Sequence, residues 1–156
     1  MANSTADGQQ NDHGRTRNSN PLIDIFALLN RYAYTARDHL DWDKLGEFFH
    51  PTAKVQLGNG KVIPHAEMRK LVPADPPKYL RHHITAIDVN FKSEREAVAN
   101  VQWFATTDLS PRDHWGEWHD TVSVDVDGAW VIMHKVIEFE GMDPNGVAAS
   151  MAVASK

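Results

Sequence analysis

The sequence predicts an α+β fold: a cone-shaped α+β barrel in which three N-terminal helices pack on a curved mixed or antiparallel sheet and enclose a pocket. In the first part of the chain, apolar residues recur at three- and four-residue spacing, which is typical of amphipathic helices. From residue 79 to residue 139, apolar and polar residues alternate instead, which is typical of strands buried on one face. Helices followed by strands indicate an α+β organisation.

Length and composition indicate one globular domain. With 156 residues, 42% of them hydrophobic, the chain is long enough to bury a core. A net charge of -5 without any run of Lys or Arg argues against nucleic acid as a partner. No apolar stretch is long enough to span a bilayer. Without Cys there is no disulfide framework, which is compatible with a cytoplasmic location.

The expected domain spans residues 21–140. Residues 1–20 are rich in Asn, Ser, Gly and Gln, and we expect them to form a disordered tail. They contain no apolar segment of the kind that secretory signals have. Residues 141–156 are expected to form a C-terminal tail.

The first helix begins at Pro21, a residue favoured at the first helical position, and its apolar stripe runs to about His39. Tyr34 and Asp38 are four residues apart, so they share a stripe beside the apolar one. From this phase alone, Asp38 is expected to be a solvated carboxylate at the helix end.

Two shorter helices are expected next. Asp41 caps the first of them, and Trp42 lies on its buried side. Residues 53–57 alternate in polarity and predict a strand, after which Pro64 opens a third helix that runs to about residue 72.

A long strand follows at residues 79–91. Its odd positions from Ile87 onward are apolar, so this face is expected to point into the core, and His83 lies on it. His82 lies on the other face, which we expect to be half solvated. An inward imidazole is either a satisfied core residue, which is the more common case, or a general acid–base group.

Residues 97–107 predict a second long strand. Trp103 and Thr107 share its inward face with several small residues, a pattern that favours a cavity lined by an aromatic wall.

Residues 115–126 predict the next strand, with Trp118 and Asp120 on its apolar side. The Asp127-Gly128 pair predicts a tight hairpin into a last strand at residues 130–139.

Four segments together resemble a known family. They are residues 38–45 (DHLDWDKL), 49–53 (FHPTA), 81–83 (RHH) and 127–130 (DGAW). Their order and spacing resemble the SnoaL-like branch of the nuclear transport factor 2-like superfamily, and within it scytalone dehydratase and the bile-acid dehydratases. The resemblance covers roughly residues 21–140.

The resemblance implies that Asp38, at the end of the first helix, orients His83 on the strand after the third helix. The chain also departs from these dehydratases. Arg37 stands where scytalone dehydratase has Tyr, and the next strand lacks its second inward His. Asp108 matches an Asp of the bile-acid enzymes, whereas Glu138 stands where they have a basic residue.

The resemblance therefore implies a cofactor-independent lyase or isomerase, of the dehydratase or cyclase type. Its substrate is expected to be a polycyclic polyketide-, steroid- or terpenoid-like small molecule. His83 would move the proton and Asp38 would hold the imidazole. The expected substrate-binding residues are Tyr34, Trp42, Trp103, Thr107, Asp108, Trp118 and Asp120.

No cofactor is expected, because the chain has neither a glycine-rich nucleotide motif nor an HExxH metal motif. Residues 114–119 contain two His and one Glu, but without a recognised metal-ligand spacing.

Two other functions stay open. The first is a non-catalytic ligand-binding or oligomerisation module of the same fold. The second is an epoxide hydrolase, for which Arg37 and Arg81 are the candidate basic residues. Apolar outer strand positions, among them Phe104, Ile132 or Met133, and Ile137, indicate a homodimer or homotrimer.

Overall fold

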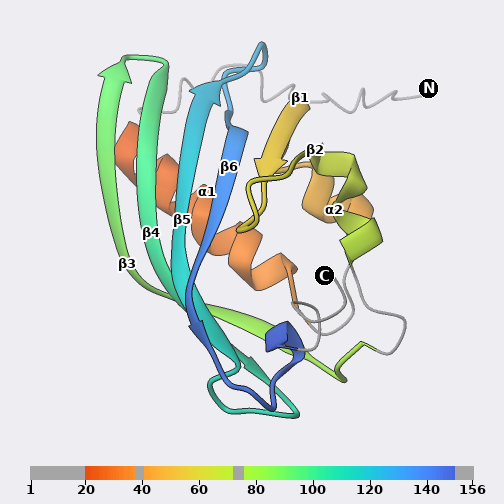
Figure 1. The fold of residues 1–156 in the computed structure, drawn as a ribbon. Helices are drawn as coiled ribbons and strands as arrows, with labels where there is room; N and C mark the ends of the chain where they lie inside the picture. Colours follow the sequence, from red (N-terminus) through yellow and green to blue (C-terminus); the bar gives the residue numbers. More distant parts are fainter. Residues whose placement is uncertain (1–19, 38–40, 72–75, 150–156) are drawn as a thin grey trace, which may run out of the picture.

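The computed structural model describes residues 20–37, 41–71 and 76–149 and confirms the α+β prediction. Helices α1 (Pro21–Thr35) and α2 (Trp42–Gly46) and the 3-10 helix η1 (His65–Leu71) pack against one six-stranded sheet (Figure 1). The strands are β1 (Phe49–Gln56), β2 (Val62–Pro64), β3 (Leu80–Ser93), β4 (Glu96–Thr107), β5 (His114–Val124) and β6 (Trp130–Met142).

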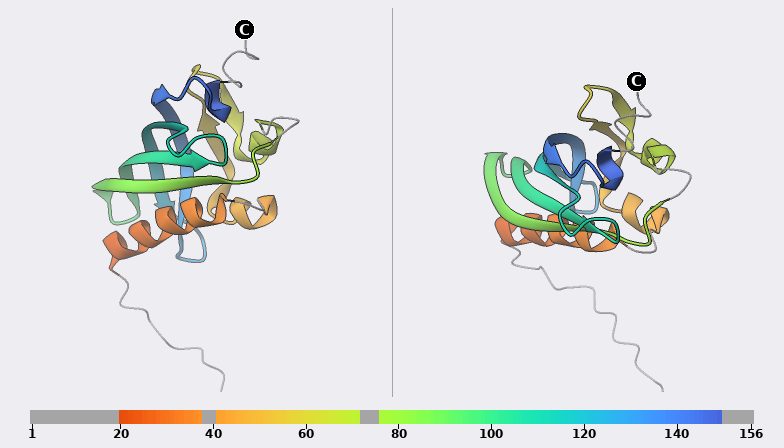
Figure 2. Two further views of the ribbon diagram at one scale, coloured as in Figure 1. Left: turned by 90° about the horizontal axis from the view of Figure 1, so that it is seen from below. Right: turned by 60° about the horizontal axis from the view of Figure 1, so that its bottom comes forward.

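The sheet is mixed and has the order β2-β1-β6-β5-β4-β3. Strand β1 runs parallel to β6, and the other neighbouring strands are antiparallel. Among the described strands, β2 and β3 form the two edges, so the curved sheet stays open. In both views of Figure 2, α1 lies along one face of the sheet, while α2 and η1 lie beside β1 and β2.

Helix α1 begins where the sequence predicts and ends earlier than expected. Pro21 is its first residue, and the Asn20 side chain accepts a hydrogen bond from the Leu22 N–H at 3.0 Å. The helix ends at Thr35 rather than near His39. Its buried residues are Ile25, Leu28, Leu29, Tyr32 and Ala33.

The buried face of strand β4 is rich in small residues. As predicted, alternate residues are buried, and three of them are Ala97, Ala99 and Ala105. The larger inward residues of the strand, Val101, Trp103 and Thr107, lie between and beyond these alanines.

A bulge interrupts β3. Ile84 pairs with Trp103 and Ala86 pairs with Gln102, so Thr85 is an extra residue with no counterpart on β4. One extra residue reverses the alternation of side chains between the two faces of a strand. The inward residues are therefore even-numbered before the bulge and odd-numbered after it.

The bulge overturns the orientation predicted for His83. Ile87 and Val89 pack against the core as expected, but before the bulge the inward residue is His82. His83 is exposed, its ring stacks on Phe104 at 4.8 Å, and its Nε2 lies 3.2 Å from the Thr106 hydroxyl. The prediction that His83 faces the interior is wrong because it extended the alternation of the later half back across the bulge.

Other boundaries also differ from prediction. Strand β1 begins at Phe49, and Pro64 ends β2 instead of opening a helix. Residues 147–149 form a helical turn beyond the predicted domain end, with Val147 and Ala148 buried. None of the helices in the described ranges is both long and apolar enough to cross a bilayer.

Candidate functional site

Four aromatic rings from three strands form a buried cluster, called here the interior cluster: His82, Trp103, His114 and Trp118. The His82 ring centroid lies 5.3 Å from Trp103, 5.5 Å from Trp118 and 5.8 Å from His114. The Trp103 and Trp118 indoles stack at 5.3 Å. Because alternate residues of β4 and β5 face inward, both indoles and His114 come from the face that the sequence identifies as buried.

The His82 imidazole is neutral. Burial lowers its pKa to about 3; the Lys135 ammonium acts in the same direction, as does His114 whenever it is protonated. The backbone carbonyl of Ala36, just after α1, accepts a hydrogen bond from the ring, while Nδ1 has no hydrogen-bond partner. The ring proton therefore lies on Nε2, and the lone pair lies on a buried Nδ1.

The His114 imidazole is held by a carboxylate. Its Nδ1 lies 2.7 Å from Oδ1 of Asp113, whose side chain is fully buried. Burial lowers the pKa of His114, and Asp113 opposes this only in part. As in other His–Asp pairs, the carboxylate fixes the tautomer, so that Nδ1 carries the proton and Nε2 carries the lone pair.

Asp113 stays ionised despite its burial. Burial raises the pKa of the carboxyl group, but hydrogen bonds from His114, Val147, Ala148 and Thr107 outweigh it and hold the pKa below its usual range. Hydrogen bonds to a carboxylate favour its charged form. The pair is therefore an anion beside a neutral imidazole that can accept a proton.

A buried ion pair lies next to the Trp118 ring of the cluster. Nζ of Lys135 lies 2.8 Å from Oδ2 of Asp120, and both side chains are fully buried. The ammonium also lies 3.8 Å from the Trp118 ring centroid and 4.4 Å from that of Tyr32. Burial raises the pKa of the Tyr32 hydroxyl, and the Asp120 charge adds to this effect.

Lys135 faces inward because of a second bulge. Ile132 pairs with Val122 and His134 pairs with Thr121, so Met133 is the extra residue of β6. This irregularity lets both Ile132 and Lys135 face the interior. It also means that Ile132 is not an outer apolar residue, whereas Met133 is half-buried.

The structure brings part of the predicted site together. Trp103 and Trp118 belong to the interior cluster. Asp120 is the next inward residue of β5 after Trp118, and its partner Lys135 contacts the Trp118 ring. Thr107 is buried as predicted, but its hydroxyl donates to Oδ2 of Asp113 at 2.9 Å. Its role in this arrangement is to hold the carboxylate.

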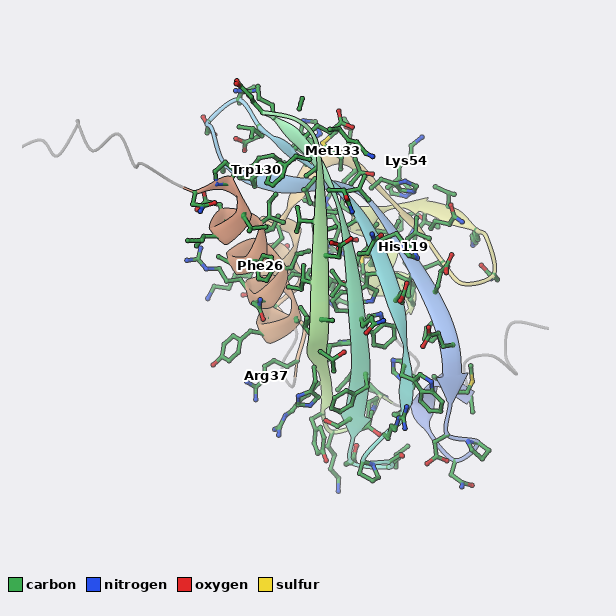
Figure 3. All side chains as sticks on the ribbon, turned by 90° about the vertical axis from the view of Figure 1, so that its left-hand side faces the viewer. Phe26, Arg37, Lys54, His119, Trp130 and Met133 are labelled. Carbon is green, nitrogen blue, oxygen red and sulfur yellow. The ribbon has the colours of Figure 1, made fainter. Side chains whose placement is uncertain are left out.

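Other predicted residues lie elsewhere. The Tyr34 side chain is 71% exposed and packs against the Arg37 guanidinium, which Figure 3 shows beyond the end of α1. Asp108 is exposed and accepts a hydrogen bond from the Lys78 N–H at 2.9 Å. Both side chains therefore lie outside the interior cluster. Asp38 lies outside the described residues.

Trp42 lines a different space. With Phe49 and His65, whose rings stack at 5.1 Å, it borders a cavity of about 440 Å³ between α2, β1 and η1. No member of the interior cluster lines this cavity.

The outer face of the sheet also carries ionisable groups. Nε2 of His119 lies 3.7 Å from a Glu117 carboxylate oxygen and 3.4 Å from one of Glu138. Figure 3 shows His119 on the sheet, well away from α1. Within the described residues, no three or more His, Asp or Glu side chains are arranged to hold a metal ion.

Five residues of the site carried no role in the sequence prediction: Tyr32, His82, Asp113, His114 and Lys135. For His114 a signal exists, because it shares the parity of the predicted inward residues Trp118 and Asp120. For His82 and Lys135 none exists, since bulges set their orientation.

The comparisons with known proteins agree with this fold. A model of the SnoaL-like domain matches residues 23–153. The chain belongs to the SnoaL-like family. No curated protein matches this SnoaL-like chain.

Three solved structures share the fold of this SnoaL-like protein. A candidate scytalone dehydratase from Novosphingobium aromaticivorans is 18% identical, with a TM-score of 0.67, over 78% of this chain and 85% of that one. Nuclear transport factor 2 from Cryptosporidium parvum is 13% identical, with a TM-score of 0.63, over 78% and 97%. ActVI-ORFA from Streptomyces coelicolor is 11% identical, with a TM-score of 0.63, over 76% and 96%. Identities this low show the fold alone.

The buried ion pair predicts a specific stability pattern. Replacing Lys135 with Met leaves the Asp120 carboxylate buried without its cation, which typically costs about 3–5 kcal/mol of unfolding free energy. Replacing both residues, with Asp120→Leu added, should recover most of this loss. Urea unfolding of the single and double variants measures both values. A double variant no more stable than Lys135→Met would contradict this account of the pair.

The low pKa of His82 predicts a pH dependence of stability. Below pH 6.5 the unfolded chain protonates His82, whereas the folded chain keeps it neutral to about pH 3. The stabilisation from the neutral ring is thus complete above pH 6.5 and falls with acidification, by at most about 1.4 kcal/mol per pH unit. Urea unfolding at pH 7 and pH 4.5 should show the wild type losing more stability than His82→Asn. Equal losses in the two proteins would rule out a buried neutral His82.

Proposed function

We propose that this SnoaL-like protein is a cofactor-independent lyase or isomerase of the dehydratase or cyclase type. Its substrate is a polycyclic polyketide-, steroid- or terpenoid-like small molecule, and His82 and His114 are its acid–base groups. One observation carries the proposal: two neutral imidazoles from different strands lie 5.8 Å apart in a buried aromatic cluster, and a buried carboxylate holds one of them.

The two imidazoles suit a dehydration. A neutral imidazole takes a proton from the carbon next to a substrate carbonyl, and the electron pair of that C–H bond forms the new C=C bond. The C–O bond to the β-hydroxyl breaks, and the hydroxyl leaves as water with a proton from an imidazolium. Each positioned acid–base group typically contributes about 10²–10⁴-fold. His114 is the better base of the two, because Asp113 stabilises its imidazolium.

The aromatic residues supply the surroundings that this reaction needs. Trp103 and Trp118 can stack on a flat polycyclic substrate and exclude water from the imidazoles. Trp103 Nε1 and His82 Nδ1 are both buried without a hydrogen-bond partner. Each such atom costs about 1–3 kcal/mol. A substrate that carries an oxygen acceptor and a hydroxyl donor would supply the two missing bonds.

The family resemblance supports the same reading. Scytalone dehydratase has a second inward His, which the sequence of β4 lacks, and His114 at the start of β5 offers one. The dehydratase-like neighbour is in agreement with a lyase. Because nuclear transport factor 2 shares the fold, the fold alone does not separate catalysis from ligand binding. We also propose that the protein associates into a homodimer or homotrimer. The half-buried Phe104 on the outer face of the sheet supports this association.

Turnover of polycyclic β-hydroxy ketones such as hydroxylated tetralones tests the proposal, since water loss extends the conjugated ring system and changes its ultraviolet absorption. We expect His114→Asn and His82→Asn each to lower kcat/KM by about 10²–10⁴-fold. The adjacent, outward-facing His83→Asn should retain most of the rate, and His119→Asn is the control for an unrelated histidine.

Two outcomes would contradict the proposal. If kcat/KM falls in His83→Asn and not in His82→Asn, then His83, and not His82, is the acid–base group. Tight binding of the tetralones by calorimetry, without turnover by the wild type, would identify a binding module.

A further inference from the structure

The C-terminal turn of the described chain is attached to the loop that carries the His–Asp pair. The Asp143 N–H donates to the backbone carbonyl of Asp113 at 2.7 Å. The Ser110 hydroxyl donates to Oδ2 of Asp143 at 2.7 Å. Two contacts therefore dock residues 143–146 on the loop between β4 and β5 before the chain reaches Val147.

The next two residues bond directly to the Asp113 side chain. The Val147 N–H donates to Oδ2 at 2.7 Å and the Ala148 N–H donates to Oδ1 at 3.2 Å. Oδ1 also lies 2.7 Å from Nδ1 of His114. One carboxylate thus joins the imidazole on one side to two backbone donors of the C-terminal segment on the other.

Gly146 makes this approach possible. A Cβ at this position would lie 2.7 Å from both Cγ and Oδ2 of Asp113, closer than side chains approach in folded proteins. Any larger residue must move either the turn or the carboxylate. Glycine is therefore required at this position by the close approach.

We propose that residues 143–148 are a positioning element for the His114 imidazole, acting through Asp113, with the Val147 and Ala148 N–H groups as the donors and Gly146 as the residue that admits them. This inference rests on the proposed function only for its catalytic consequence, because the contacts themselves are independent of any substrate. It makes the expected C-terminal tail part of the site.

The electrostatic consequence has a definite sign. Donors that share a carboxylate compete for its charge, so the two N–H groups weaken the pull of Asp113 on the His114 imidazolium. The other groups near His114 are His82 from β3, which is neutral, the Trp103 indole from β4 and the Phe139 ring from β6. Removing one backbone donor should therefore raise the pKa of His114.

Val147→Pro removes the N–H that donates to Oδ2 of Asp113, and its ring Cδ then takes the place of that hydrogen, so this contact with the carboxylate is lost. Val147 is the first residue of the helical turn, a position that accepts proline because its ring fixes a helical φ. Val147→Ala is its matched control, since it shortens the same buried side chain and keeps the N–H group. In pH titrations of the full chain by NMR, we expect the His114 ring signals to move to a higher midpoint in Val147→Pro and to keep the wild-type midpoint in Val147→Ala.

A second measurement needs no substitution. In the wild type, the amide signals of Val147 and Ala148 should shift with pH at the same midpoint as the His114 ring, because they share one carboxylate. Identical His114 midpoints in folded Val147→Pro and Val147→Ala, or amide signals that ignore the His114 transition, would overturn the proposal. Both readouts are independent of turnover. The proposed function can therefore fail while this inference stands, and this inference can fail while the proposed function stands.

Discussion

The extra residue in β3 is the constraint on which the site depends. Strand β3 must bury Ile87 and Val89 against α1 at one end and present an imidazole to the interior at the other. A regular strand with this sequence would place His83 inward and His82 outward. The bulge at Thr85 reverses this order, so that His82 joins two indoles and a second imidazole. Bulges are common beside functional sites because they redirect side chains in this way.

The buried charges around the cluster support one another. Lys135 and Asp120 form an ion pair next to the Trp118 ring, and the Lys135 ammonium helps to keep His82 neutral. Asp113 is kept anionic by hydrogen bonds rather than by a cation. The interior therefore contains an ion pair and a separate carboxylate, while both imidazoles are without charge. Such a site is prepared to receive a proton.

Most of the fold was predictable, because it follows from side-chain periodicity. The sequence identifies α1, the alternation of β4 with Trp103 and Thr107 inward, and the inward Trp118 and Asp120 of β5. The site was only partly predictable. Sequence spacing cannot show a bulge, which is decided by how well each half of a strand fits its neighbour, and so His82 was missed.

Ring-to-ring NMR contacts test the central claim most directly. The claim is that His82, rather than His83, faces the interior aromatic cluster. In protein with labelled histidine and tryptophan, nuclear Overhauser effects should connect the His82 ring protons to the Trp103 and Trp118 indoles, whose centroids lie 5.3 and 5.5 Å away. The His83 ring should instead show them to Phe104. Contacts from His83 to the indoles, with none from His82, would contradict the account.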